Sequence, residues 1–580
     1  MALATARTKG GFAKTSASRM TWVLLFFYAS CALLLGRLFF LQIVHHGDYA
    51  RLAAKQHQSA KTTSGERGTI AMQDRTGALI PLAFNRIEQT LAASPRNVTD
   101  ARAAAAFVAD AFEIQADEVQ KKLEKRDDLY EVLVKKVDAK RADSLAPGLP
   151  EGLFFEEEKR RAYPHGTLGA HVVGFVSKEE SEEVGRYGLE RFYERELTGK
   201  TDFFAGAERT KAYWLSLGKK IVNPPKNGSD IVLTIDYNIQ LKAEEALRRA
   251  AEKWSASSGA ILVVEPATGK IRALAGVPAF DPNEFSKETD FSVFLNRAVE
   301  AQYELGSVMK PLTMATALEE GKVRPTTTYE DMGSVRFGGY KIQNFDLKAH
   351  GVQTMSQVIE KSLNTGMVYV ARQIGKDAHL EFLRRFGLGE KTGVDLPGEL
   401  AGDISNLSEG RDIDFATASF GQGIAVTPLQ TVMALAAIAN HGVLMKPYVL
   451  ERITDDSGNE VRREPETVRR VISAGTAEEL TKMLVATVRN SFENRAKVKG
   501  YFVAGKTGTA QIPREDGRGY SDDVIHTFVG YAPAFEPKFL VYIQLNKPKG
   551  NRFAANTLTP FFHDLAEYML NYYEIPPDEK

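Results

Sequence analysis

Cysteine is almost absent from this chain. Cys31 is the single one among 580 residues, and it lies in an apolar run. An intramolecular disulfide is therefore excluded, which is normal for a cytosolic protein and equally for a large exported protein whose core is sufficient. A chain of this length is too long for one compact core, so we expect two or more domains.

An excess of charge of either sign is also absent. Lysine and arginine total 74, and aspartate and glutamate total 74, which gives a formal net charge of zero. Nucleic acid as the main partner would need a net basic surface, so we exclude it. The 10 histidines are scattered, without H-x-x-x-H or C-x-x-C spacing, and we expect no metal site and no cofactor.

Long apolar runs are rare, with one exception near the N-terminus. Residues 1–20 carry four basic side chains and no acidic one, and residues 22–44 are nearly all apolar. About 20 apolar residues span a bilayer as a helix, and the basic flank before them stays inside. We therefore expect a cytoplasmic tail over 1–20, a single transmembrane helix over 21–44 and an extracytoplasmic remainder. The basic residues of the tail are Arg7, Lys9, Lys14 and Arg19.

Arg37 and the alternative of a signal peptide both bear on the interpretation of residues 21–44 as an anchor. Arg37 interrupts the apolar run, but it sits near the outer end, where a long side chain can reach the interface. A cleaved signal peptide is the alternative interpretation. The run is long for a signal peptide and no A-x-A-like site follows promptly, so we favour the anchor.

The remaining chain divides at residues 223–230, where turn-forming residues accumulate. We expect a mixed pedestal domain over 45–225, with a helix leaving the membrane over 45–60 and a charged helical stretch over 101–146. Residues 226–580 form the second predicted domain.

The second domain has strand patterns at both ends and helix patterns between them. The predicted strands cover 231–235, 259–265, 271–275, 502–504, 509–511, 526–532 and 539–544, and the predicted helices include 239–254 and 558–573. The strands 259–265 and 271–275 are joined by a short turn with glycine, which predicts an antiparallel hairpin. This order predicts an α+β fold, with one central antiparallel sheet flanked by helices.

Three short motifs carry the chemistry of the second domain. Ser307-Val-Met-Lys310 is an S-x-x-K at the start of a helix pattern, so Lys310 lies on the same face as the Ser307 hydroxyl. A second S-x-x-K, Ser216 to Lys219, has no such setting. Each motif alone is a weak signal, because chance matches are expected in a chain of this length.

The other two motifs follow in order. Ser362-Leu-Asn364 is an S-x-N in a helical stretch, and Lys506-Thr-Gly-Thr509 is a K-T-G after a strand pattern. Two duplicates, Ser457-Gly-Asn459 and Lys391-Thr-Gly393, are interpreted as a solvated turn and a structural loop. The order S-x-x-K, S-x-N, K-T-G in one domain is far more specific than any one of its parts.

With these motifs the chain resembles the class B penicillin-binding proteins, the membrane-anchored peptidoglycan D,D-transpeptidases, over essentially its whole length. Residues 420–424 (Phe-Gly-Gln-Gly-Ile) with Thr427-Pro428 resemble the division branch of the family, the FtsI type. Further segments that resemble the family are Arg37 to Gln42, Arg67-Gly68, Asp74 to Gly77, Tyr187 to Glu190, Leu197 to Gly199 and Gly393 to Glu399.

The chain departs from the family pattern at two places. Leu305 stands where the family usually has proline, two residues before the nucleophile, and two extra residues separate Arg67-Gly68 from Asp74. The first change affects the rigidity of the turn before Ser307, and the second affects the pedestal. Glu304 and Gly421–Gly423 are interpreted as structural.

The resemblance implies a role for each motif residue. Ser307 would attack the D-Ala–D-Ala amide of a donor stem peptide, with Lys310 as the general base. Lys310 can act only when it is neutral, so its pKa must be lowered by burial and by Lys506. Ser362 would relay a proton to the leaving amine, and Asn364 would hydrogen-bond the donor backbone.

The K-T-G segment is implied to bind the donor. Lys506, Thr507 and Thr509 would hold the terminal carboxylate, with Gly508 between them. The backbone N–H groups of Ser307 and Thr509 would form the oxyanion hole. An acyl-enzyme would form on Ser307, an amine of a second stem peptide would resolve it, and a β-lactam would trap it.

The resemblance also implies a cytoplasmic (inner) membrane location, a periplasmic catalytic domain and partners that include divisome proteins and a polytopic FtsW-like glycosyltransferase. The alternatives are an elongation-type transpeptidase, a serine β-lactamase, a β-lactam sensor and a non-catalytic division scaffold. A β-lactamase would be about half as long and unanchored. A β-lactam sensor needs a signalling module on the inner side of the membrane, and only residues 1–20 precede the predicted anchor. A G-x-S-x-G hydrolase is excluded, because that pattern is absent.

Overall fold

The computed structural model describes residues 14–40, 65–179, 182–199, 226–337, 339–491, 495–514 and 519–578. Two compact units divide the chain: residues 1–65 with 200–226, and residues 66–199 with 227–580. The predicted helix over 45–60 and the motif from Ser216 to Lys219 lie outside the described residues.

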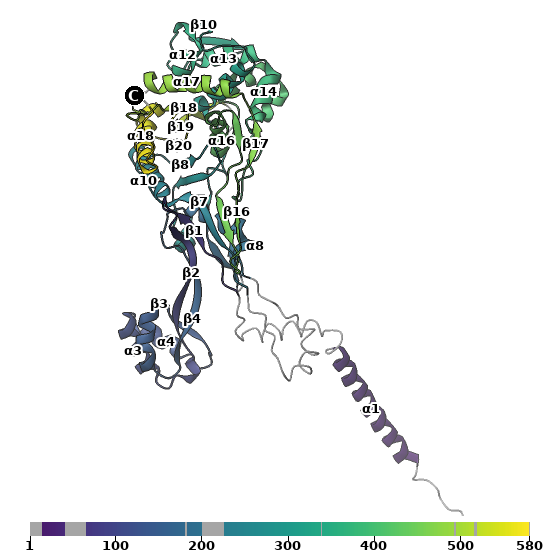
Figure 1. The fold of residues 1–580 in the computed structure, drawn as a ribbon. Helices are drawn as coiled ribbons and strands as arrows, with labels where there is room; N and C mark the ends of the chain where they lie inside the picture. The colour runs from purple at the N-terminus through teal and green to yellow at the C-terminus, as the bar shows by residue number, and fades with distance from the viewer. Residues whose placement is uncertain are drawn as a thin grey trace, which may run out of the picture. The chain divides into compact units, whose positions relative to one another are not determined.

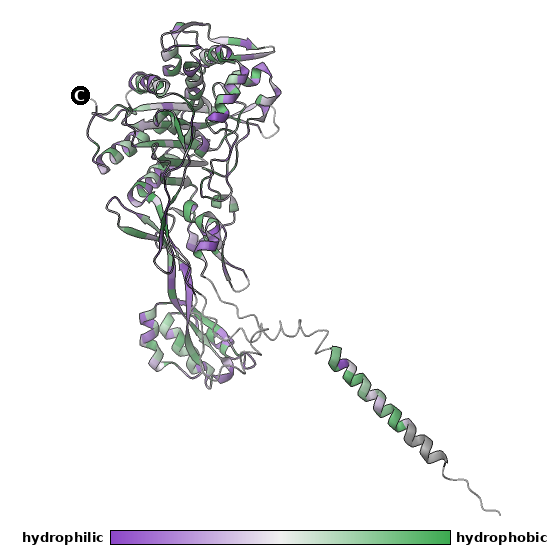
Figure 2. Cartoon of the chain, turned by 45° about the vertical axis from the view of Figure 1, so that its right-hand side comes forward, coloured by the Kyte–Doolittle hydropathy of each residue, from purple (hydrophilic) through white to green (hydrophobic). Residues whose placement is uncertain are grey.

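The first unit contains one long helix, α1 (Lys14–Phe39). Its segment Trp22–Phe39 has a mean hydropathy of 1.9 and no buried residue, and Figure 2 shows it mainly in the hydrophobic colour. At 1.5 Å per residue, 18 residues extend about 27 Å, close to the thickness of a bilayer core. The helix is therefore long and apolar enough to cross a membrane as a single-pass anchor.

The second unit begins with a seven-stranded sheet in the order β16-β15-β7-β1-β2-β3, in which β4 also pairs with β2. The strands of its N-terminal part are β1 (Ile70–Gln73), β2 (Leu79–Ala93), β3 (Glu131–Val137) and β4 (Leu153–Ala162). The helices beside them are α3 (Ala101–Phe112), α4 (Ala116–Leu123) and α5 (Ala139–Leu145). A two-stranded sheet, β5 (Val176–Glu179) and β6 (Glu182–Gly185), and the short helices α6 (Ala170–Val173), α7 (Gly188–Phe192) and α8 (Glu194–Leu197) follow.

The predicted helical stretch over 101–146 is wrong at residues 131–137, which form a strand. It contains α3, α4 and α5, but β3 lies between α4 and α5 and pairs with β2. The sequence of β3 includes three β-branched valines, which suit a strand. Glu113 ends α3 in the left-handed conformation, and the Asp138 side chain caps α5.

The strand β7 (Asp230–Asp236) also differs from the prediction. It was expected in the antiparallel sheet of the second domain, but it pairs in parallel with β1 and antiparallel with β15 (Leu450–Thr454), which pairs with β16 (Glu460–Arg462). The alternation of a strand indicates its faces and not its neighbours, so this pairing is not readable from sequence.

The second sheet confirms the predicted α+β architecture. It is antiparallel, in the order β18-β19-β20-β8-β9, with β8 (Ser258–Val264), β9 (Ile271–Val277), β18 (Ala504–Pro513), β19 (Tyr520–Ala532) and β20 (Phe539–Asn546). The predicted hairpin is β8–β9. The two strands predicted over 502–504 and 509–511 are one strand, β18, which starts at Ala504.

Helices cover both faces of this sheet. Along β8, Leu262 and Val264 belong to one core, and Ile261 and Val263 to the other, as the twofold period of a strand requires. The second core is closed by α10 (Tyr237–Trp254) and α18 (Ala554–Tyr572), and the first by α11 (Lys310–Glu319) and α16 (Pro428–Ala439). Figure 1 shows α10 and α18 on one side of the strands and α16 on the other.

The middle of the chain supplies the remaining elements. The helices are α12 (Met355–Glu360), α13 (Asn364–Ile374), α14 (Lys376–Arg385), α15 (Asp412–Ala418) and α17 (Ala474–Ser491). Three strand pairs accompany them: β10 (Thr328–Asp331) with β13 (Gly351–Thr354), β11 (Ser334–Phe337) with β12 (Tyr340–Gln343), and β14 (Val443–Met445) with β17 (Thr467–Arg470).

Candidate active site

The S-x-x-K motif lies in a tight turn. Ser307 belongs to the 3₁₀ turn η6 (Gly306–Met309), and the α-helix α11 starts only at Lys310. The sequence predicted that the helix opens at Ser307, whereas α11 begins three residues later. In a 3₁₀ turn the side chains at positions i and i+3 eclipse each other. The turn therefore directs Ser307 and Lys310 to the same side.

Close backbone packing holds this turn in place. Gly306 has a φ of +64°, and its N–H donates to the Gly421 carbonyl at 3.0 Å. A Cβ on Gly421 would lie 2.2 Å from the Gly306 carbonyl oxygen. On the other side, a Cβ on Gly508 would lie 2.7 Å from the Leu305 carbonyl oxygen. Glycines at 421 and 508 thus let two segments approach the turn η6, which carries Ser307.

The S-x-N motif forms the link between two helices. Ser362 follows α12 and has a φ of +57°, in the left-handed region that a non-glycine residue adopts rarely. Asn364 is the first residue of α13. Ser362 is therefore not helical, although the sequence had predicted a helical stretch there. Such strain persists where the surrounding structure enforces it, and it is common at functional sites.

Lys310 is fully buried and makes three polar contacts. Its Nζ lies 2.6 Å from the Ser362 carbonyl oxygen, 3.2 Å from Ser362 Oγ and 2.8 Å from Asn364 Oδ1. Burial, followed by the repulsion of Lys506, holds the pKa of Lys310 well below its ordinary value. A neutral amine satisfies all three contacts when it donates to the two carbonyl oxygens and the Ser362 hydroxyl donates to it.

Lys506 approaches the same hydroxyl from β18. Its Nζ donates to Ser362 Oγ at 2.9 Å and to the Thr507 carbonyl oxygen at 3.0 Å. Burial lowers the pKa of Lys506 to about 7. Ser362 Oγ therefore lies between two buried amines from different parts of the chain, in a position to pass a proton between them.

The K-T-G segment occupies an edge strand. Strand β18 pairs only with β19 among the described strands, and residues of β18 pack against the turn η6. Thr507 and Thr509 are half-buried, and Gly508 packs against the turn. Thr509 Oγ1 accepts a hydrogen bond from the N–H of Ala554, at the start of α18, at 3.3 Å. Free backbone groups and hydroxyls at an edge strand can bind an extended peptide or a carboxylate.

The structure thus brings together all eight residues that the sequence singled out. They come from η6, α11, the α12–α13 link and β18, which are separated by up to about two hundred residues in the chain. The two duplicate motifs lie elsewhere. Thr392 donates to Glu399 in a loop, and Ser457 and Asn459 belong to the exposed turn between β15 and β16.

Two contacts at the site were not found by sequence reasoning. Asn364 Nδ2 donates to the Gln343 carbonyl oxygen at 2.9 Å, and a backbone carbonyl gives no side-chain signal. The Tyr520 hydroxyl donates to Glu304 Oε2 at 2.9 Å, just before the turn η6. Burial raises the pKa of Glu304. This pair ties β19 to the turn and agrees with a structural role for Glu304.

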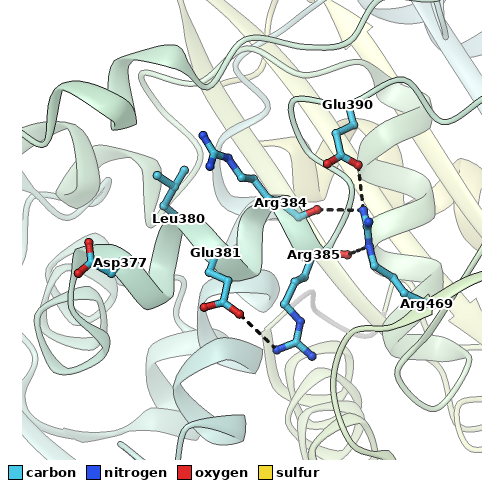
Figure 3. A pocket seen from close by; sticks show the side chains of 7 residues that line it. All are labelled: Asp377, Leu380, Glu381, Arg384, Arg385, Glu390 and Arg469. Carbon is cyan, nitrogen blue, oxygen red and sulfur yellow. Dashed lines mark hydrogen bonds and ion pairs between the residues drawn. The ribbon is translucent and has the colours of Figure 1, made fainter.

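A surface hollow of about 330 Å³ lies apart from these residues. Figure 3 shows its lining, which comes mostly from α14. The hollow contains none of the eight residues above. Its lining residues are Asp377, Leu380, Glu381, Arg384, Arg385, Glu390 and Arg469.

The arrangement suits acyl transfer on a substrate that carries a carboxylate. A serine in a tight turn lies beside a lysine that burial keeps neutral, a second hydroxyl can move protons, and an edge strand offers hydroxyls and an amine. These are the parts of a nucleophile, a base and a substrate clamp.

Comparisons with known proteins agree with this chemistry. Residues 259–567 match the family model described as penicillin binding protein transpeptidase domain, and residues 62–233 match the penicillin-binding protein dimerisation domain. Stage V sporulation protein D of Bacillus subtilis is 31% identical over 94% of this chain and 84% of its own length. Peptidoglycan D,D-transpeptidase FtsI of Escherichia coli is 28% identical over 94% of this chain and 90% of its own length.

A solved structure is similar as well. The crystal structure of penicillin binding protein 3 from Mycobacterium tuberculosis, complexed with aztreonam, has a TM-score of 0.68 and 26% identity. The match covers 89% of this chain and 97% of the chain in that crystal structure.

Proposed function

Since the chain belongs to the class B penicillin-binding proteins and is a peptidoglycan D,D-transpeptidase, we propose that Ser307 forms the acyl-enzyme and that the protein cross-links septal cell wall. The observation that carries the first part is the Ser362 hydroxyl, 3.2 Å from Lys310 Nζ and 2.9 Å from Lys506 Nζ. Both amines have lowered pKa values because they are buried.

In the proposed acylation step, Ser307 Oγ attacks the carbonyl carbon of the D-Ala–D-Ala amide, and its proton passes to neutral Lys310. The N–H groups of Ser307 and Thr509 stabilise the oxyanion. The C–N bond then breaks, and the leaving amine takes a proton from Lys310 through Ser362. D-Alanine departs, and an ester with Ser307 remains.

In the second step an amine of a neighbouring stem peptide attacks this ester. The new amide forms, the ester C–O bond breaks, and Ser307 regains a proton through the same pair of groups. During both steps Asn364 aligns the donor backbone. Lys506, Thr507 and Thr509 hold the terminal carboxylate until D-alanine leaves, and Gly508 lets the strand lie against the turn.

The architecture proposed around this site is an anchor, a pedestal and a catalytic domain. Residues 1–20 lie in the cytoplasm, 21–44 cross the inner membrane, 45–225 form the pedestal and 226–580 the transpeptidase domain outside the membrane. The basic residues before the apolar helix support this orientation. An FtsW-like glycosyltransferase and divisome proteins are the proposed partners of the anchor and pedestal.

Septal synthesis rests on the segments 420–424 and 427–428. A sporulation role is the second candidate, because the relative at 31% identity is named for that process. A fluorescent fusion to the full chain would separate them. Accumulation at mid-cell in growing cells supports division, and accumulation only in sporulating cells supports the second role.

The first experiment on the site is intact-protein mass spectrometry after incubation with benzylpenicillin. The wild-type enzyme should gain one penicillin mass, and Ser307→Ala should gain none. Loss of free penicillin without an adduct would favour a β-lactamase. Neither adduct nor loss would count against Ser307 as the nucleophile and favour a non-catalytic scaffold.

A further inference from the structure

An aromatic strap lies beside the catalytic residues, formed by Phe345, Phe553 and Arg552. The rings of Phe345 and Phe553 meet edge to face, with centroids 5.5 Å apart. The guanidinium carbon of Arg552 lies 5.0 Å from the centroid of the Phe345 ring. Phe345 comes from the loop after β12 and the other two from the loop before α18, so the strap joins two distant parts of the chain.

Each end of the strap is tied to a proposed substrate-binding residue. Phe345 follows Gln343, whose carbonyl accepts from Asn364 Nδ2 at 2.9 Å. Phe553 precedes Ala554, whose N–H donates to Thr509 Oγ1 at 3.3 Å. The strap therefore extends from the S-x-N side of the site to the K-T-G side, and a donor lying between Asn364 and Thr509 lies next to it.

Beside the ring of Phe345, Arg552 presents guanidinium N–H groups as hydrogen-bond donors. Its side chain is exposed, and no carboxylate among the described residues forms an ion pair with it. Stacking on an aromatic ring uses the face of the guanidinium and leaves the N–H groups at its edge available. An arginine fixed in this way is suited to bidentate recognition of a carboxylate, because less conformational freedom is lost on binding.

We propose that Arg552 binds a side-chain carboxylate of the donor stem peptide, carried by a diamino-dicarboxylic acid that precedes D-Ala–D-Ala. An extended peptide rises about 3.3 Å per residue, so this residue lies about 7 Å along the donor from the terminal D-alanine. Its long side chain reaches past the Thr509 end of the site. Arg552 is then a specificity-determining residue, and the assignment rests on the proposed acylation of Ser307.

The test uses two donor peptides that end in D-Ala–D-Ala and differ only in that side-chain carboxylate, free in one and a carboxamide in the other. Exchange of the terminal D-alanine for labelled D-alanine by the full-length enzyme in detergent reports acylation, with the same acceptor in every reaction. Wild type should prefer the free carboxylate by about tenfold, the effect of one hydrogen bond to a charged group. Arg552→Gln should abolish the preference.

Three controls isolate the charge on Arg552. Benzylpenicillin has no second carboxylate, so its rate of adduct formation should be the same in wild type and Arg552→Gln. Arg384→Gln removes another exposed arginine, in the hollow of Figure 3, and should keep the preference. Arg552→Lys keeps the positive charge, so this variant should keep part of the preference for the free carboxylate. Added salt should weaken this preference in the wild type.

Two results would overturn the proposal: equal rates for the two donors in wild type, or an equal loss for both donors in Arg552→Gln. Failure of benzylpenicillin to acylate the wild-type enzyme is a separate result. It would remove the proposed role of Ser307, and the assignment of Arg552 would fall with it.

Discussion

The hydroxyl of Ser362 lies between the amines of Lys310 and Lys506, and the pKa values of both amines are lowered. Lys310 and Lys506 are buried, and their nitrogens are 3.2 Å and 2.9 Å from this oxygen. Burial disfavours the charged form of each, and the second cation disfavours it further in Lys310. The two lysines therefore titrate as a coupled pair, and their common pH range decides when Lys310 can accept a proton.

The rate of acylation by benzylpenicillin should rise with pH, because the fraction of neutral Lys310 grows, and the lowered pKa of Lys310 places this rise well below the titration range of an ordinary lysine. Lys506→Gln removes the neighbouring cation, so the pKa of Lys310 rises and the ascending limb of the rate should move to higher pH. A pH–rate profile of both proteins measures this. An unmoved limb would contradict the coupling.

The same groups link stability to pH. Lys506 has a pKa of about 7 in the folded protein and 10.5 as an ordinary lysine. Between these values the unfolded chain binds more protons, so the contribution of Lys506 to the free energy of unfolding rises with pH across this range.

At the scale of elements, the site depends on how closely β18 approaches η6. Gly508 is buried in β18, where a Cβ would lie 2.2 Å from Thr527 Oγ1 and 2.7 Å from the Leu305 carbonyl oxygen. The glycine of K-T-G is thus explained by the close packing of β18 against its neighbour β19 and against the turn η6. The same approach brings Lys506 to Ser362.

Gly508→Ala should separate this strand from the turn. We expect a loss of about 1–3 kcal/mol in the free energy of unfolding from overpacking, and acylation slower by about a hundredfold from the displaced groups. Gly475→Ala is the matched control, because a Cβ at that position in α17 meets nothing within 4 Å. Thermal unfolding and adduct formation should be unimpaired in the control. Equal behaviour of the two variants would refute the packing argument.

At the scale of the whole second unit, a buried ionic cluster joins segments that are far apart in sequence. Glu190 accepts from Arg67 at 2.6 Å and from Arg161 at 2.7 Å, and Arg67 also pairs with Glu194 at 2.7 Å. Glu190 is fully buried, and the side chains of Arg67 and Arg161 are 7% and 1% exposed. Glu190 thus compensates the charge of Arg161 and, together with Glu194, that of Arg67.

Glu190→Gln should leave both arginines buried with less compensation, and we expect a loss of about 3–5 kcal/mol in the free energy of unfolding. Glu252→Gln removes the partner of Arg248 in an exposed pair on α10 and should cost about 0.3–0.5 kcal/mol. Urea unfolding of the full chain in detergent, with the wild type beside both variants, measures the difference. A small loss in both would mean that the cluster is not a structural anchor.

The sequence alone determined the long apolar helix near the N-terminus and the α+β class, and it singled out the eight candidate site residues. These depend on local properties: an uninterrupted apolar run, the period of strands and helices, and short motifs in a fixed order. Local patterns also led to errors. The charged stretch with helical spacing predicted helix where β3 lies, and the helical pattern around residues 362–364 gave no sign of the left-handed backbone at Ser362.

Only the tertiary structure decided which groups meet. The parallel pairing of β7 with β1, the position of Ser362 Oγ between Lys310 and Lys506, and the contact of Arg552 with Phe345 all join segments distant in the chain. Such pairings follow from how whole faces pack to bury apolar surface. The free energy of that packing is shared among many residues, so no local window of the sequence contains it.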